Sequence, residues 1–319
     1  MLKSLHNNVC CRCVVVHSIL RRYAVDVGSD NDDVDDDVWK FLRSSGPILD
    51  VRSPSEYLLG HIPGAISFPM FTDEERAQIG TCYKRESREK AVELGFDFIG
   101  PRLGDLIRNA KKLSPNSNDI RIHCARGGMR SQSVAWCLNI AGFRTTVLVG
   151  GYKYYRKWVL SSFKETKPVL LLGGMTGTSK TEILHCLAQR GEQVLDLEAR
   201  ANHRGSTYGA INMPNQPTAQ NFENLLATDW RNFSASHPIW VEAESPNIGK
   251  CWIPKELKEQ MRNARAFEVT KPIEERIEHL MQIYGSTELE AFIESTKRIQ
   301  KRLGSETTGN VITLIQQGN

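Results

Sequence analysis

The sequence predicts two α/β domains in series, each built on a mostly parallel sheet, followed by a charged helical tail. Three observations support this prediction. A chain of 319 residues corresponds to two domains at about 150 residues each. Short apolar segments alternate with helical ones, which is typical of parallel sheets covered by helices. The composition, 40% hydrophobic and 24% charged, is that of an ordinary globular protein.

The composition also excludes several classes of protein. No run approaches the roughly 18 apolar residues that a membrane helix needs, so no membrane span is predicted. The net charge of +4 is compatible with an anionic partner but does not require one. The eight cysteines have no regular spacing, and Cys10, Cys11 and Cys13 lack a second pair that would complete a zinc site. We therefore predict neither a disulfide framework nor a metal site.

Residues 1–37 are predicted to precede the first ordered domain. Residues 1–23 contain four Lys or Arg and no acidic residue, which is typical of an organelle transit segment; a disordered start is an equal alternative. Residues 26–37 hold seven aspartates, whose mutual repulsion favours a solvated linker. We expect a cytoplasmic protein, or a mitochondrial or plastid one if the leading segment is a transit signal.

The first ordered domain is expected over residues 38–160 and the second over residues 168–319. In the first, strands are predicted at 47–51, 65–68, 119–123 and 145–149, with helical segments near 39–42, after Ser53, and over 84–113 and 131–141. A helix and linker over 152–167 follow. In the second, strands are predicted at 168–172, 193–197, 239–242 and 266–269, and a helical tail at 273–303.

A cysteine-containing loop follows the third predicted strand. The strand ends at His123, and the next seven residues, CARGGMR, lead into a helix. Such a loop directs several backbone N–H groups and a helix N-terminus at one point, and its two glycines permit a tight turn. These amides, together with Arg126 and Arg130, would stabilise a thiolate. We therefore predict that Cys124 is a nucleophile.

Two families share this arrangement of a cysteine and an arginine. Cys124 and Arg130, with five residues between them, fit the loop of cysteine-dependent phosphatases. The other candidate is the rhodanese family of sulfurtransferases, whose cysteine carries a persulfide. Residues 50–57 (DVRSPSEY) and 60–65 (GHIPGA) resemble the rhodanese hallmark, in which Asp50 and Arg52 would form structural hydrogen bonds. The sequence therefore favours a rhodanese-like first domain without excluding phosphatase chemistry.

A glycine-rich loop follows the first strand of the second domain. Residues 173–181 read GGMTGTSKT and resemble a Walker A P-loop, in which Gly174, Gly177, Lys180 and Thr181 would bind phosphate. Lys180 would neutralise the phosphate, and the Thr181 hydroxyl would ligate Mg²⁺ if a nucleotide binds. Ser179 stands where glycine is usual, which costs roughly 1–2 kcal/mol if the position requires a positive φ.

Two further pairs of residues are candidates for ligand binding. His203 and Arg204 follow the strand at 193–197 and could contact a phosphate, although a polar loop is an alternative. Glu242 and Glu244 lie at the end of a strand, where sites of α/β proteins collect. A structural carboxylate pair is an equal alternative for these two.

The two domains together resemble the tRNA 2-selenouridine synthase family. The resemblance covers about residues 39–305 and rests on the segments 74–84, 124–131, 150–153, 202–206 and 241–249. It implies a transferase that replaces sulfur by selenium in 2-thiouridine at the wobble position of tRNA. Selenophosphate would be the selenium donor. Geranyl diphosphate would first convert the base to S-geranyl-2-thiouridine, whose thioether leaves more readily.

The resemblance also implies roles for individual residues. Cys124 would lie at the selenium-handling site, and the P-loop would hold a phosphate of a co-substrate, with no tightly bound cofactor. Lys84, Arg85 and Arg88 form a basic stretch that would meet the tRNA backbone or else face solvent. Two other functions stay open. One is a sulfurtransferase or cysteine phosphatase with an accessory P-loop; the other is a non-catalytic homologue that binds tRNA or phosphate.

Overall fold

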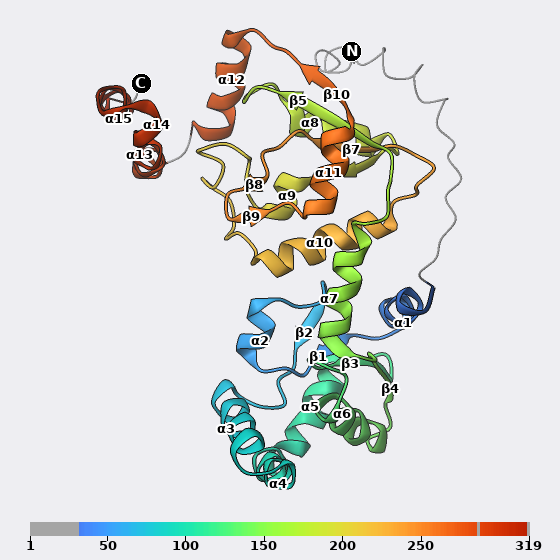
Figure 1. The fold of residues 1–319 in the computed structure, drawn as a ribbon. Coiled ribbons are helices and arrows are strands. Elements are labelled where there is room, and N and C mark those ends of the chain that lie inside the picture. The colour runs from blue at the N-terminus through green and yellow to red at the C-terminus, as the bar shows by residue number, and fades with distance from the viewer. Residues whose placement is uncertain (1–31, 286–287, 318–319) are drawn as a thin grey trace, which may run out of the picture.

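The computed structural model describes residues 32–285 and 288–317 and contains a parallel sheet in each half of the chain (Figure 1). The predicted fold class, two α/β domains and a helical C-terminal region, is confirmed. In Figure 1 the first domain lies at the bottom, the second lies at the top, and helix α7 connects them. The transit-like residues 1–23 and the cysteines among them lie outside the described residues.

The first domain has four parallel strands in the order β2-β1-β3-β4. They are β1 (Ile48–Asp50), β2 (Ala65–Ser67), β3 (Asp119–His123) and β4 (Arg144–Val147). The helical elements are α1 (Asp32–Arg43), α2 (Pro54–Leu59), α3 (Asp73–Arg85), α4 (Arg88–Ile99), the short 3₁₀ turn η2 (Gly100–Arg102), α5 (Leu103–Leu113) and α6 (Met129–Ile140). Because helices cover the sheet, Leu49, Ile120 and Ile122 are fully buried in a common core.

The second domain has four parallel strands in the order β10-β5-β7-β6. They are β5 (Val169–Gly174), β6 (Gln193–Leu195), β7 (Ile239–Glu242) and β10 (Arg265–Val269). A hairpin of β8 (Asn247–Ile248) and β9 (Cys251–Trp252) adds a small second sheet. The helices are α8 (Lys180–Gln189), α9 (Leu197–Ala201), α10 (Ala219–Asn232), α11 (Lys255–Asn263) and α12 (Ile273–Tyr284), followed by the tail helices α13 (Leu289–Arg298), α14 (Gln300–Leu303) and α15 (Ser305–Gln316).

Helix α7 (Gly151–Ser162) joins the two domains through one continuous core. Its Tyr155, Trp158 and Val159 are fully buried and belong to a hydrophobic cluster with residues of both domains. Ile62 enters this cluster from the first domain and Phe222 from α10 of the second. The two domains therefore bury apolar surface against each other, which opposes their separation.

Polar contacts between α10 and the first domain accompany this core. The buried Asn224 donates to the His61 carbonyl oxygen at 2.7 Å and to the Tyr152 hydroxyl at 3.0 Å. The side-chain oxygen of Asn221 accepts a hydrogen bond from the His61 N–H at 2.9 Å. The turn after α2 is thereby tied to the second domain.

Some elements differ from the prediction. Helix α1 begins at Asp32, inside the stretch predicted as a solvated linker, because Val38 and Phe41 anchor it in the shared core. The helical stretch predicted over 84–113 is the end of α3 followed by α4 and α5, with a break at Pro101. The hairpin β8–β9 and the helix α15 have no counterpart in the prediction. Within the described ranges, no helix is long and apolar enough to cross a membrane.

Candidate functional site

The cysteine loop lies between the end of β3 and the start of α6, as the sequence predicts. Its backbone is tightly curled, and Gly127 has a φ of +65°. A Cβ at Gly127 would lie 2.7 Å from the Leu148 carbonyl oxygen and 2.8 Å from the Gly150 nitrogen. Glycine is therefore required here both for its backbone conformation and for close packing.

The N-terminus of α7 is hydrogen-bonded to the backbone of this loop. The amides of Tyr152 and Lys153 donate to the carbonyl oxygens of Cys124 and Ala125 at 2.8 and 2.9 Å. A Cβ at Gly151, which has a φ of +59°, would lie 2.4 Å from the Cys124 carbonyl oxygen. With the carbonyls fixed on α7, the N–H groups of the loop are available to the cysteine sulfur.

The sulfur of Cys124 is held in a buried, polar environment. The residue is 3% exposed, and its Sγ lies 3.2 Å from the Ser131 hydroxyl oxygen. Burial raises the pKa of the Cys124 thiol. Hydrogen bonds from the Ser131 hydroxyl and from the backbone N–H groups of Arg126 and Ser131, with the charge of Arg130, outweigh burial and lower this pKa below its ordinary value. The arrangement favours a reactive thiolate.

The two arginines of the loop act differently from each other. Arg126 is exposed, and its backbone N–H donates to the Cys124 sulfur; a role for its side-chain charge stays a prediction. Arg130 forms a salt bridge with Glu56 of α2 at 2.6 Å.

Beneath the loop is a buried polar cluster. Arg52 donates to both carboxylate oxygens of Asp50 and to the Gly60 carbonyl oxygen, and it lies over the Tyr152 ring at 3.9 Å. These contacts confirm the structural hydrogen bonding expected of Asp50 and Arg52. Burial lowers the pKa of His123 to about 4, although the nearby Asp50 acts to raise it, so this histidine is neutral at pH 7.

The phosphate loop connects β5 to α8. Gly174 and Gly177 have φ angles of +146° and +86°, and a Cβ at Gly174 would lie 2.6 Å from the Val269 carbonyl oxygen. Lys180, the first residue of α8, donates from Nζ to the Gly174 carbonyl oxygen at 2.8 Å. The strand, the curled loop and the lysine at a helix N-terminus form the geometry of a P-loop.

Ser179 has the positive φ that was the condition for strain at this position. Its φ is +64° and its ψ is 34°, which costs a non-glycine residue roughly 1–2 kcal/mol. Its hydroxyl accepts a hydrogen bond from Lys271 Nζ at 2.8 Å. Arg276 of α12 donates to the Thr176 carbonyl oxygen at 2.9 Å. Lys271 and Arg276 therefore add two positive charges to that of Lys180.

Carboxylates lie beside the start of α8. The Thr181 hydroxyl donates to Glu198 at 3.3 Å, and burial followed by the charge of Glu244 raises the pKa of Glu198 to about 7. Glu242 is 3% exposed and accepts a hydrogen bond from the Glu198 N–H at 2.7 Å; burial raises its pKa. Its other oxygen, Oε2, has no hydrogen-bond partner within the described residues. Hydroxyl and carboxylate oxygens are the ligands Mg²⁺ prefers, so this set fits that ion.

His203 and Arg204 lie in the loop after α9, where His203 is buried and Arg204 contacts neighbouring residues. His203 is buried, and burial followed by the charge of Arg298 lowers its pKa. Arg204 donates to the Ile211 carbonyl oxygen at 2.7 Å and lies over the Tyr284 ring at 5.6 Å. Both contacts of Arg204 stabilise the loop and its packing on α12.

The predicted basic stretch is exposed at the turn between two helices. Lys84 and Arg85 end α3, and Arg88 begins α4. Arg88 lines a small cavity together with Arg130 of the cysteine loop. Arg88 therefore shares a cavity wall with the loop that carries the predicted nucleophile.

Four residues near the two loops were not predicted as site residues from the sequence. Glu56 belongs to the rhodanese-like segment, but its pairing with Arg130 depends on tertiary contact. Glu198 and Lys271 follow strands β6 and β10, and Arg276 lies in α12. Because the carboxyl ends of parallel strands meet at one edge, the position of Glu198 and Lys271 after strands was a usable signal.

A cavity at the other edge of the second sheet lies away from both loops. It has a volume of about 1000 Å³ and is lined by Val169, Pro238 and Arg265, at the amino ends of β5, β7 and β10. The P-loop lies at the opposite, carboxyl edge of the same sheet. Ligand sites of such sheets lie at the carboxyl edge, so we assign no chemistry to this cavity.

Both domains that contain these loops match known protein families. The family model of the rhodanese-like domain matches residues 34–157, and that of the tRNA 2-selenouridine synthase AAA domain matches residues 167–319. The tRNA 2-selenouridine synthase of Nitrosomonas europaea is 34% identical over 261 residues, which are 78% of this chain and 66% of that protein. Those of Cronobacter sakazakii and Pseudomonas syringae are each 34% identical, covering 86% and 85% of this chain and 72% and 79% of theirs.

The fold and the two loops define the class of this protein: a rhodanese-like domain whose loop holds a buried cysteine with a lowered thiol pKa, fused to a P-loop domain. The aligned part spans just under two thirds of the Nitrosomonas protein and more of the other two. The chain belongs to the tRNA 2-selenouridine synthase family.

The first testable prediction concerns the contact between Ser131 and the sulfur. A hydroxyl has one hydrogen, and the charged thiolate is a stronger acceptor than the nearby Gly128 carbonyl. Ser131→Ala removes that donor, so the midpoint of Cys124 alkylation against pH should rise, by about one pH unit for one lost charged hydrogen bond. Iodoacetamide labelling followed by peptide mass spectrometry measures the midpoint.

Ser133→Ala, on the same helix but without a contact to the sulfur, is the matched control and should leave the midpoint unchanged. An equal midpoint in Ser131→Ala and the parent protein would contradict the assigned role.

Proposed function

We propose that this protein replaces the sulfur of 2-thiouridine at the tRNA wobble position by selenium, through an S-geranyl intermediate. The observation that carries the proposal is the presence of two anion-binding loops in one chain of this family. One of them holds a buried cysteine with a lowered pKa, and the other has the geometry of a P-loop. The first supports selenium chemistry and the second supports diphosphate binding.

The P-loop serves the first step of the proposed reaction. The thione sulfur of the base attacks C1 of geranyl diphosphate, a C–S bond forms, the C–O bond breaks, and the N3 proton leaves. Lys180 and the N–H groups at the start of α8 stabilise the departing diphosphate, and Lys271 and Arg276 add positive charge nearby. Hydrolysis of a nucleotide is not required.

The cysteine loop serves the second step. Selenium from selenophosphate adds to C2 of the base, the C–S bond breaks, and geranyl thiol leaves; water cleaves the P–Se bond and releases phosphate. The amides beside Cys124 suit an anionic selenium or phosphate group. Cys124 would position the selenium beside C2 during this transfer without forming a bond to it, so the selenium keeps its oxidation state.

Two further parts of the proposal concern the cofactor and the compartment. Thr181, Glu198 and Glu242 would hold Mg²⁺, which supplies charge neutralisation for a bound diphosphate. No tightly bound cofactor is needed beyond the co-substrates. The protein would act on tRNA in the cytoplasm, or in a mitochondrion or plastid if residues 1–23 are a transit signal.

The second prediction separates the two steps. In Cys124→Ser, S-geranyl-2-thiouridine should form and accumulate while 2-selenouridine is lost, because the P-loop is intact. In Lys180→Ala the geranylated base should be lost, and the Cys124 thiol should keep its reactivity. Mass spectrometry of nucleosides from tRNA incubated with geranyl diphosphate and selenophosphate measures both products.

Lys164→Ala, an exposed lysine at the end of α7, is the control and should form both products. Normal 2-selenouridine from Cys124→Ser, or geranylated base from Lys180→Ala at the parent rate, would refute the division of labour between the loops.

The third prediction concerns tRNA binding. Replacing Lys84, Arg85 and Arg88 by glutamate should weaken tRNA binding at low salt by about tenfold or more and flatten its salt dependence, because phosphate contacts release counterions. The melting temperature should change little, since all three side chains are exposed. Filter binding over a salt series measures the slope.

Reversal of Arg108, Lys111 and Lys112 on α5 gives the same change of net charge and is the control. If both triple variants bind tRNA equally well, the tRNA surface lies elsewhere.

A further inference from the structure

We propose that an apolar groove beside the cysteine loop, between α3, α4 and α6, binds the prenyl chain of the S-geranylated tRNA. This inference rests on the proposed function and extends it by giving the chain a site. The groove would hold the intermediate during selenium transfer, after the diphosphate has left the P-loop.

The groove begins next to the nucleophile. A cavity of about 100 Å³ is lined by Met129 and Arg130, which form the first turn of α6 directly after the cysteine loop. Apolar side chains form the other walls, among them Phe71, Ile79 and Val92 from α3, α4 and the segment before them. A chain seated there would place its attached base toward Cys124.

The groove continues away from the loop. A second cavity of about 390 Å³ shares Met70, Phe96 and Ile99 with the first and is lined further by Leu106 and Trp136. The two cavities together are large enough for a ten-carbon chain. Most of their lining residues are apolar, with Arg88, Arg130, Gln132 and Ser133 as the polar ones, and sites for small apolar ligands are built in this way.

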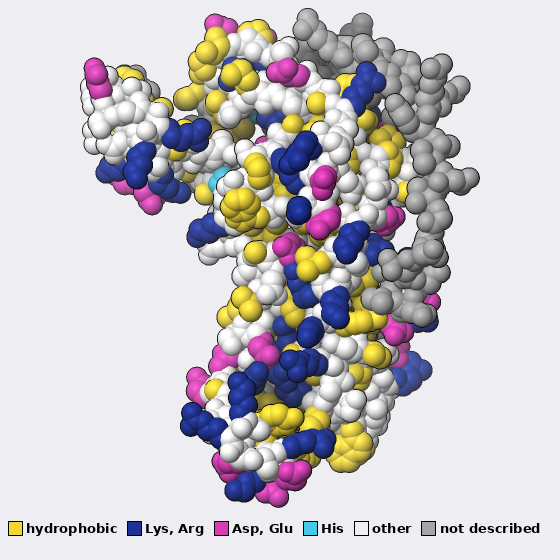
Figure 2. All heavy atoms as spheres, in the orientation of Figure 1, with side chains coloured by type: hydrophobic (Ala, Val, Ile, Leu, Met, Phe, Trp, Pro, Cys, Tyr) yellow, Lys and Arg dark blue, Asp and Glu magenta, His cyan; other side chains and the backbone are white. Residues whose placement is uncertain are grey.

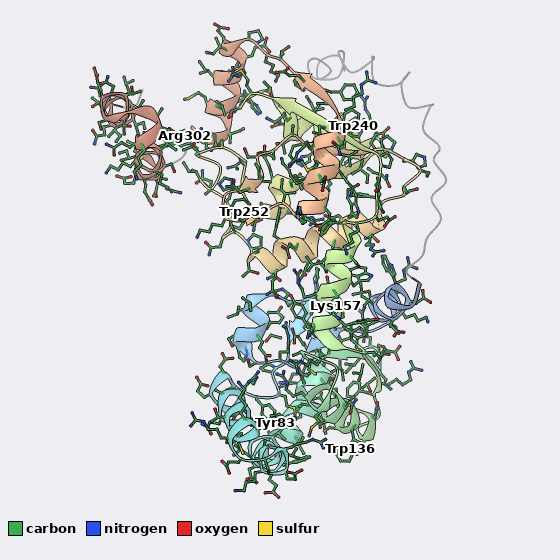
Figure 3. The ribbon with its side chains drawn as sticks, viewed as in Figure 1. Tyr83, Trp136, Lys157, Trp240, Trp252 and Arg302 are labelled. Atoms are coloured by element: carbon green, nitrogen blue, oxygen red, sulfur yellow. The ribbon has the colours of Figure 1, made fainter. Side chains whose placement is uncertain are left out.

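Large apolar side chains at this surface are exposed. Phe96 is 58% exposed and Trp136 is 63% exposed, and Tyr83 is similar. Figure 3 shows Tyr83 and Trp136 at the end of the molecule formed by α3 to α6. Figure 2 shows apolar side chains there among Lys and Arg side chains. Contiguous exposed apolar surface of this kind marks a binding site.

The positive charge beside the groove indicates what kind of ligand binds there. Arg88 lines it, and Lys84 and Arg85 lie at the adjacent helix end. Arg130 also lines it, but its charge is paired with Glu56. Basic groups beside apolar walls fit a ligand that is both polyanionic and lipid-like. An unmodified tRNA or a free phosphate would leave the apolar walls in water, whereas a tRNA carrying a prenyl thioether satisfies both parts.

The test compares two ligands for one protein. The probes are an anticodon stem-loop with S-geranyl-2-thiouridine and the same stem-loop with 2-thiouridine. The parent should bind the geranylated probe at least about tenfold more tightly, because apolar carbon leaves water. Val92→Trp fills the first cavity and should reduce this preference to about twofold or less, with the affinity for the thiouridine probe unchanged. Ile140→Trp, at an exposed apolar position of α6 outside both cavities, should keep the preference.

The outcomes separate this inference from the proposed function. If Val92→Trp keeps the preference, or the parent has none, the groove is not the prenyl site, even where the parent converts the geranylated probe to 2-selenouridine. If the parent binds with the expected preference but makes no 2-selenouridine with selenophosphate, the proposed function fails and the prenyl site stands. Should Val92→Trp not fold, Phe96→Ser removes an exposed wall side chain and should lower the preference in the same direction. The parent and Val92→Trp are also compared for self-association. If Val92→Trp no longer self-associates but still prefers the geranylated probe, the groove is an interface between two molecules of this protein, and the proposal is overturned.

Discussion

The contact between the first turn of α7 and the cysteine loop is the constraint on which the rest of the structure depends. Amides of Tyr152 and Lys153 bind the carbonyl oxygens of Cys124 and Ala125. Because these carbonyls point to α7, the amides of the loop remain for the sulfur, and the thiol pKa falls. The same helix carries Tyr155 and other buried side chains into the core shared with the second domain. One helix thus shapes the nucleophilic loop and attaches the P-loop domain.

Both candidate sites use the same physical device. Each lies at the carboxyl edge of a parallel sheet, where a strand ends in a glycine-containing loop and a helix begins. Backbone amides then form most of the anion site, and side chains adjust it. In the first domain Ser131 and Arg130 make that adjustment, and in the second Lys180 and Lys271 do. The arrangement suits a reaction whose co-substrates are a selenophosphate and a diphosphate.

The sequence predicted those features that depend on local pattern. Apolar strands followed by glycine loops located Cys124 and Lys180. The glycine normally found at Ser179 raised the question of a positive φ there, and the structure has one. Features that depend on contacts between distant segments were not predictable in this way. The pairing of Arg130 with Glu56 joins residues 74 positions apart, and helix α1 forms in an aspartate-rich stretch because a tertiary core anchors it.

The most direct test of this account adds one methyl group at the contact between α7 and the loop. Gly151→Ala places a Cβ 2.4 Å from the Cys124 carbonyl oxygen, whereas Gly142→Ala meets nothing within 4 Å; both glycines have a positive φ, so both variants carry comparable backbone strain. The measurement is the rate of Cys124 alkylation at pH 7 in the two folded variants. We expect a much slower rate for Gly151→Ala and a parental rate for Gly142→Ala. Equal rates in all three proteins would show that α7 does not shape the cysteine loop.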